Sequence, residues 1–190
     1  MNQKTLKIFY IIEILLIGIM IVNLITGNVL PIFLSNRMLL YFHIIGGIFL
    51  IGNGVVTAFY LVILELTKNK ETFTTMLKMV LYTDLVFTGP GIILLFLSGS
   101  QLTIPYGIYY EIHWLLYAIV SFGISGIIWT AILIPLQFWF LTKVEEGIFP
   151  WESSKESSIF KIALISFNVF GSISLAFIFY SLYLMVVRNV

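Results

Sequence analysis

The stretch MLLYFHIIGGIFLIGNGVVTAFYLVIL, from Met38 to Leu64, contains no Asp, Glu, Lys or Arg. A helix needs about 20 apolar residues to cross the hydrocarbon core of a bilayer, and this stretch is long enough to do so. The whole chain of 190 residues is 60% hydrophobic and 10% charged, with a mean hydropathy of +1.07. A soluble domain carries about 25% charged residues, and one of this size could not bury so much apolar surface. The sequence therefore predicts a membrane protein.

Four further apolar stretches have the length of a membrane span. Together with the first they predict five transmembrane helices, at about residues 8–26, 38–64, 79–97, 112–140 and 162–187. Alternation with a period of two residues is absent, which argues against a membrane-spanning β-barrel. The predicted fold is therefore an all-α, polytopic membrane helix bundle, with residues 1–190 forming a single integral membrane domain. The last four helices resemble a four-helix bundle.

Charge and cysteine content exclude several classes of partner and cofactor. The net charge is +1, so the chain has no basic field for nucleic acid, and its first partner is the lipid bilayer. The sequence contains no cysteine. Disulfides, thiolate zinc sites, cysteine-ligated iron–sulfur clusters, covalently attached c-type haem and cysteine nucleophiles are therefore excluded.

The distribution of basic residues predicts the orientation in the membrane. Lysine and arginine concentrate in cytoplasmic segments, so the N-terminus is expected inside the cell and the C-terminus outside, in the cytoplasmic (plasma) membrane. The first span is expected to stay attached as a signal anchor, because no small-residue cleavage site follows its apolar run. With this orientation only Arg37 and Arg188 lie outside, and eight lysines lie inside: Lys4, Lys7, Lys68, Lys70, Lys78, Lys143, Lys155 and Lys161.

The chain has two histidines, and both fall within predicted spans. Ionisable side chains are costly in lipid, so each one invites a functional explanation. His43 and His113 lie on spans that both enter from the outer side, so the imidazoles are expected at similar depth. Two such imidazoles can bind one haem iron from opposite faces without any cysteine. Small residues follow His43, and they are expected to leave room for a flat ring or to let another helix approach closely. They are Gly46, Gly47 and Gly54.

Simpler explanations of both histidines remain open. His43 can form a hydrogen bond with a neighbouring helix. His113 lies beside Trp114 near a helix end, and it can belong to the aromatic belt at the lipid headgroups. The haem iron is the only metal that the sequence indicates, with His43 and His113 as its candidate ligands.

Asp84 is the only charged residue in the predicted third span. Thr88 lies one helical turn further along the same face, and the Gly89-Pro90-Gly91 sequence is expected to kink and loosen the helix, since proline removes a backbone donor. An acid beside a broken helix is typical of proton and cation sites in transporters. The alternative is an acid that only joins helices through hydrogen bonds.

Other polar residues favour structural roles. Glu13, in the first span, is interpreted as a protonated acid or as one that extends toward the cytoplasmic headgroups. Pro135, close to Gln137, predicts a second kink with a role in packing.

Three blocks of sequence resemble one family. They are His43 with Gly46, then Asp84 with Phe87, Thr88 and Pro90, then Trp129 with Pro135 and Gln137. In this order they resemble the uncharacterised family 2269 of predicted integral membrane proteins, from about Leu40 to Glu146, with the first span as an addition. That family is similar to copper-resistance D-like proteins and membrane-bound protoporphyrinogen oxidases, several of which are thought to bind b-type haem through a histidine. The resemblance therefore implies His43 as a haem ligand.

The sequence leaves two functions open. The first is a haem b protein for electron transfer or redox chemistry, with a quinone, a porphyrin or another redox subunit as its partner. The second is a transporter or an accessory membrane subunit without haem, which binds a proton or cation at Asp84 and Thr88 and works as an oligomer. A purely structural subunit is a third reading. The sequence assigns no catalytic residue and does not decide whether the protein is an enzyme.

Overall fold

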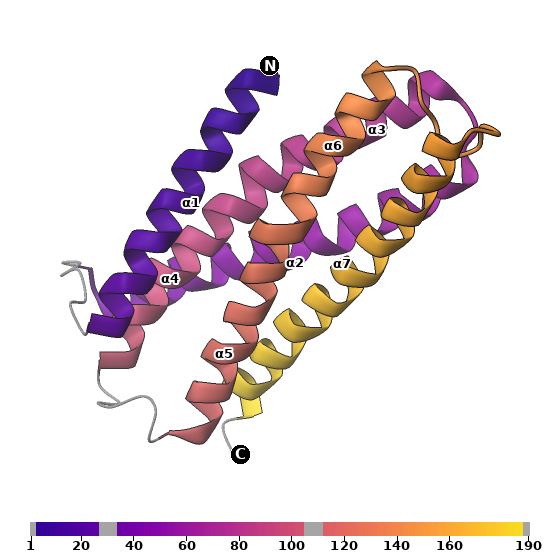
Figure 1. Cartoon of the computed structure of the whole chain (residues 1–190). Helices are drawn as coiled ribbons and strands as arrows, with labels where there is room; N and C mark the ends of the chain where they lie inside the picture. The colour runs from indigo at the N-terminus through magenta and orange to yellow at the C-terminus, as the bar shows by residue number, and fades with distance from the viewer. Residues whose placement is uncertain (1–2, 27–33, 105–111, 188–190) are drawn as a thin grey trace.

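The computed structural model describes residues 3–26, 34–104 and 112–187 (Figure 1). These residues form an all-helical bundle, and five of its passes are long and apolar enough to cross a membrane. The predicted fold class is therefore confirmed. In chain order the elements are α1 (Gln3–Thr26), α2 (Asn36–Leu66), α3 (Lys70–Thr83), the π-helical turn η1 (Asp84–Thr88), α4 (Gly89–Thr103), α5 (His113–Ile128), the π-helical turn η4 (Trp129–Leu133), α6 (Ile134–Glu145) and α7 (Lys155–Val187).

The helices extend beyond the apolar stretches that predicted them. The third pass begins at Lys70 rather than near residue 79, because Asn69 caps it by accepting a hydrogen bond from the Thr72 amide at 2.9 Å. The fifth pass begins at Lys155. Hydropathy marks the part of a helix that lies in lipid, whereas caps determine where the helix itself starts.

The bundle is built from two closely packed pairs of helices. The most extensive contacts join α2 to α4 and α5 to α7, and smaller contacts join α2 to α7 and α3 to α6. A Cβ placed on Gly46 of α2 would lie 2.9 Å from the carbonyl oxygen of Gly91 on α4. The two backbones therefore approach as closely as small residues permit. The space at Gly46 is filled by α4, so this glycine leaves no room for a flat ring.

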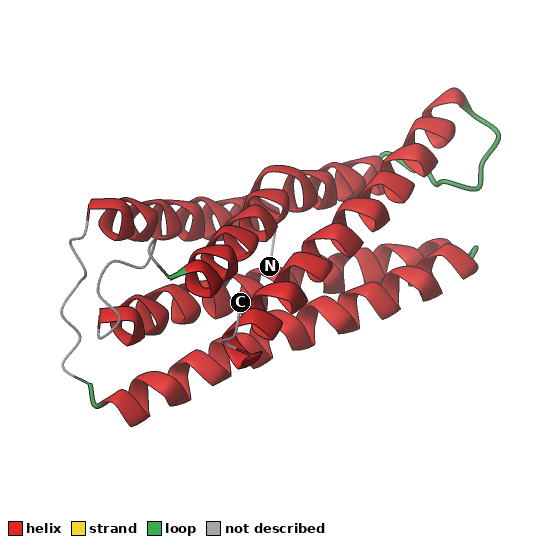
Figure 2. Cartoon of the chain, turned by 90° about the horizontal axis from the view of Figure 1, so that it is seen from below, coloured by secondary structure: helices red, strands yellow, loops and turns green. Residues whose placement is uncertain are grey.

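The first helix lies on the outside of the bundle. In Figure 1, α1 runs beside α4, and its most extensive contacts are with α4 and η1. The Tyr10 ring of α1 also lies 6.0 Å from the Phe138 ring of α6. Seen from below in Figure 2, the described helices run alongside one another. Large apolar side chains cover the outer surfaces of α1, α2 and α7, such as Leu15, Phe59 and Val186. This is the expected composition of surfaces whose solvent is lipid.

One end of the bundle is closed by an aromatic cluster. Phe73 of α3 packs against Phe149, Trp151 and Phe160, with ring centroids 5.1 to 6.0 Å apart. Lys70 Nζ donates to Glu152 Oε1 at 2.7 Å across the same end, and this hydrogen bond holds the pKa of Glu152 below its usual range. The α2–α3 and α6–α7 connections are thereby held together.

Candidate functional site

Two passes are interrupted at equivalent places by a π-helical turn. In η1 the Gly89 amide donates to the Asp84 carbonyl, and Pro90 follows; in η4 the Ile134 amide donates to the Trp129 carbonyl, and Pro135 follows. Proline cannot donate the hydrogen bond that a regular helix requires. Widening the preceding turn by one residue accommodates this loss, and such π-bulges occur frequently at functional sites. The predicted irregularities near Pro90 and Pro135 therefore take this form.

The first residue of η1 is the centre of a buried polar network. Asn53 Nδ2 on α2 donates to Asp84 Oδ1 at 2.6 Å and lies 2.9 Å from Thr88 Oγ1. Thr88 Oγ1 donates to the same carboxyl oxygen at 3.3 Å, and Gln137 Nε2 on α6 donates to Oδ2 at 2.5 Å. All four side chains are buried. Three passes therefore converge on one carboxyl group.

The partners of Asp84 are neutral, so the network does not neutralise a carboxylate. The ion pairs among the described residues, Lys70–Glu152 and Lys143–Glu146, lie at the end of the bundle instead. An ionised carboxyl in an apolar medium carries a large desolvation cost, and binding a proton or a small cation removes that cost. Gln137 Oε1 is buried and has no hydrogen-bond partner within residues 3–26, 34–104 and 112–187. Rotation of this amide would let it accept from a protonated carboxyl instead of donating to a carboxylate.

A second carboxyl group lies against the same turn. Glu13 of α1 is buried, with 5% of its surface exposed, and its Oε2 has no hydrogen-bond partner in the described part of the chain. A Cβ on Gly89 would overlap its carboxyl group, so the bare backbone of Gly89 makes this approach possible. The expected extension of Glu13 toward the headgroups is therefore not observed, because α1 turns this side chain toward η1 and α4.

His43 contacts α4 near the other end of the bundle. Its Nδ1 lies 3.1 Å from Ser98 Oγ, and its ring lies over Gly99, where a Cβ would be 3.2 Å from Cε1. Ser98 Oγ donates its hydrogen to the Leu94 carbonyl at 2.5 Å, so it accepts from His43. A neutral imidazole that donates from Nδ1 carries its lone pair on Nε2.

His113 has different surroundings. It is the first residue of α5, its side chain is exposed, and its ring lies 6.4 Å from that of Tyr117 on the same helix. The described contacts of His43 are with α4, and α5 packs chiefly on α7. The structure thus gives the two histidines separate neighbours, and their joint binding of one iron remains a prediction.

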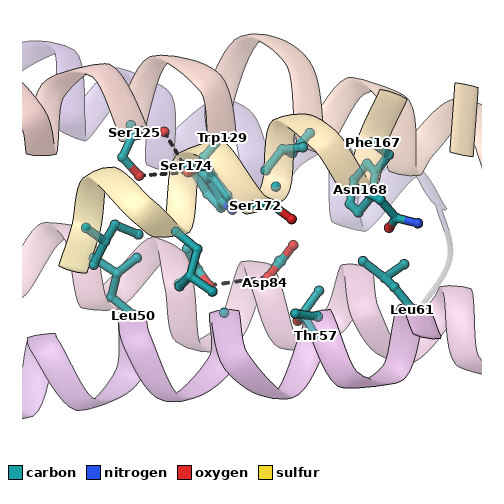
Figure 3. A pocket seen from close by; sticks show the side chains of 18 of the residues that line it. Leu50, Thr57, Leu61, Asp84, Ser125, Trp129, Phe167, Asn168, Ser172 and Ser174 are labelled. Carbon is teal, nitrogen blue, oxygen red and sulfur yellow. Dashed lines mark hydrogen bonds between the residues drawn. The ribbon is translucent and has the colours of Figure 1, made fainter. Parts of the chain in front are cut away.

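A cavity of about 270 Å³ adjoins Asp84 (Figure 3). One side of the cavity is formed by α2, η1 and α4, and the other side by α5, η4 and α7. Its walls are mainly apolar. Asp84 and Trp129, which begin the two π-helical turns, both line it. Ser125 and Ser174 join α5 to α7 at its edge, with 2.7 Å between their hydroxyl oxygens.

Comparison with known proteins agrees with the resemblance seen in the sequence. A family model described as predicted integral membrane protein (DUF2269) matches residues 37–189. The chain belongs to this family. The match extends further than the predicted resemblance, because it includes α7, and it leaves α1 outside.

The match to DUF2269 establishes that this is an integral membrane protein. No curated protein and no solved structure matches the chain. Similarity to copper-resistance D-like proteins or protoporphyrinogen oxidases therefore remains a prediction. Asn53, Asp84 and Gln137 all lie within the DUF2269 match, as does the cavity, whereas Glu13 comes from outside it.

Sequence reasoning found two of the five polar residues that meet at η1 in this DUF2269 protein. Asp84 and Thr88 were expected on one face, and the structure brings them together. It also adds Asn53, Gln137 and Glu13, for which no such role was expected. The available signal was that each is a polar residue within a long apolar stretch, which is costly unless it has a partner.

Proposed function

We propose that this protein is a small multi-pass carrier or accessory subunit of the cytoplasmic membrane, in which Asp84 binds and releases a proton or a small cation. The observation that carries the proposal is the convergence of Asn53, Thr88 and Gln137 on a buried carboxyl without a cationic partner. The adjoining cavity gives the carboxyl a space into which an exchanged ion can pass. Transporters use the same combination of an irregular helix, a buried acid and a cavity.

Infrared difference spectroscopy of the purified protein in lipid vesicles tests this proposal. Titration with pH should show the carbonyl stretch of protonated carboxylic acids in an apolar setting. Asp84→Asn should remove the component that belongs to Asp84, whereas the component of the second buried acid, Glu13, should persist. Asparagine keeps the shape and hydrogen-bonding capacity but cannot ionise. Glu152→Gln, which removes an exposed acid at the end of the bundle, is the matched control and should retain the band.

Two arms of the same experiment decide between the ions. A band that weakens when sodium replaces choline at constant pH identifies a cation that competes with the proton. A band that depends on pH alone identifies a proton site. Identical spectra of the wild type and Asp84→Asn at every pH would show that Asp84 does not titrate and would overturn the proposal.

A specific observation also supports a second candidate, a haem b protein that exchanges electrons with a quinone or another redox subunit. The hydrogen bond from His43 to Ser98 orients the imidazole and leaves Nε2 able to bind iron. Purified protein made with ample haem should then show a Soret band, and His43→Ala should remove or shift it. His113→Ala should do the same only if both histidines bind one iron. A colourless wild-type protein would contradict this candidate.

A further inference from the structure

The cavity beside Asp84 contains two buried hydrogen-bonding groups that the protein does not satisfy. Trp129 Nε1 and Thr57 Oγ1 have no hydrogen-bond partner among the residues that the structure describes, although the two side chains are only 5% and 8% exposed. Both residues line the cavity. An indole N–H can only donate, so whatever satisfies Trp129 must carry an acceptor. In Figure 3, Trp129 points from its side of the cavity toward Asp84 on the other.

The opening of the cavity faces lipid. Of the residues that line it, those whose side chains are exposed are Ala58 and Val62 on α2 and Ser172 on α7. These two helices make limited contact with each other. Leu175 of α7 packs against Gly54 of α2, whereas a Cβ on Gly171 would meet no heavy atom within 4 Å. A molecule that enters between α2 and α7 must therefore come from the bilayer and be soluble in lipid.

The charge of the lining restricts the ligand further. Asp84 is its only ionisable residue, and no lysine, arginine or histidine lines the cavity in the described part of the chain. Binding an anion here would leave its charge without a partner in an apolar medium, which is unfavourable. The donors Trp129 and Thr57 instead suit a neutral oxygen acceptor.

We propose that this cavity binds a neutral, lipid-soluble molecule with a carbonyl oxygen, which enters between α2 and α7 and accepts a hydrogen bond from Trp129 Nε1. The inference deepens the proposed function by naming the class of molecule that a carrier would handle, and it rests on that function only for the role of Asp84. The π-helical turns place the two ends of the site, since Trp129 begins η4 and Asp84 begins η1.

Photolabelling with benzophenone in lipid vesicles tests this inference, because benzophenone is a neutral aryl ketone that inserts into nearby C–H bonds when irradiated. Label on the wild type should saturate and map by mass spectrometry to the cavity-lining parts of α2, η4 and α7. Unsubstituted diphenylmethane, which lacks the carbonyl, should compete more weakly than unlabelled acetophenone. Trp129→Phe should lower the affinity for benzophenone about two- to tenfold, the effect of losing one hydrogen bond.

Filling the cavity supplies the matched comparison. Gly126 lines the cavity and Gly123 does not, although both lie on α5 and a Cβ at either would meet no heavy atom within 4 Å. Gly126→Leu should therefore reduce saturable labelling at least tenfold, and Gly123→Leu should leave it unchanged. Gly171→Leu fills the cavity from α7, where a Cβ also has free space, and provides a second blocking variant if the first fails to fold.

Two results would overturn the inference. The first is label spread over lipid-facing positions such as Leu15 and Phe59, unaffected by Gly126→Leu and Gly171→Leu. The second is an unchanged affinity of Trp129→Phe for benzophenone, which would show that the indole takes no part in binding. The infrared titration of Asp84 is done without benzophenone. Failure of the ligand proposal in photolabelling can therefore be distinguished from failure of the proton-site proposal in the titration.

Discussion

At the scale of single residues, Asp84 has partners suited to both of its protonation states. A carboxylate only accepts hydrogen bonds, whereas a carboxylic acid also donates one. Asn53 and Thr88 approach one oxygen, and Gln137, whose amide can turn to donate or accept, approaches the other. A change of protonation can thus be accommodated by one amide rotation, without a change in helix packing.

The acid at the centre was predictable, but its partners were not. A charged residue in an apolar stretch is conspicuous because of its cost in lipid, and Thr88 follows from Asp84 by helical spacing. Asn53 and Gln137 are neutral, so their cost is smaller, and nothing in the sequence shows which distant residues they face. For Glu13 the sequence left a protonated acid and an acid extended toward the headgroups both open. Because α1 is apolar around most of its circumference, its pattern does not define an inward face.

At the scale of elements, the contact between α2 and α4 depends on small residues in register. Gly46 faces Gly91, whereas its neighbour Gly47 has no heavy atom within 4 Å of a Cβ position. The sequence shows several glycines in this span but not which of them is in contact, because that depends on how the helix is rotated against a partner far along the chain. The prolines likewise predicted irregular helices, but not the π-helical geometry.

This difference predicts opposite effects of two adjacent substitutions. Gly46→Ala should destabilise the protein by about 1–3 kcal/mol, because the added methyl group presses on the Gly91 carbonyl and on Leu94 and Leu95. Gly47→Ala should be neutral or stabilising by up to about 1 kcal/mol, since alanine favours helix over glycine. Unfolding of both variants in detergent measures the difference. Equal stability of the two would show that α2 and α4 are not in close contact at Gly46.

At the scale of the whole molecule, the predicted cytoplasmic segments lie at one end of the bundle. Gln3 at the start of α1 donates to Glu145 at the end of α6 at 3.0 Å, and Lys70 pairs with Glu152 across the two connections there. Hydropathy and lysine placement were enough to predict five passes of alternating direction. We propose, from that placement, that this end faces the cytoplasm.

A pair of reporter fusions tests the orientation. A reporter enzyme that needs disulfides for activity folds only outside the cytoplasm. Fused after Val190, it should be active, and inserted after Gly147, between α6 and α7, it should be inactive. Activity at the second position without activity at the first would mean that the protein is inserted in the opposite direction.

The two π-helical turns also make the fold sensitive to the deletion of a single residue. Each turn holds one residue more than a regular helix would, and each begins six positions before a proline, Asp84 before Pro90 and Trp129 before Pro135. Loss of a single residue within 84–88 would remove the widened turn and rotate α3 by about 100° relative to α4. The acid would then leave Asn53 and Gln137. One additional residue in each turn thus sets the orientation of both ends of the cavity.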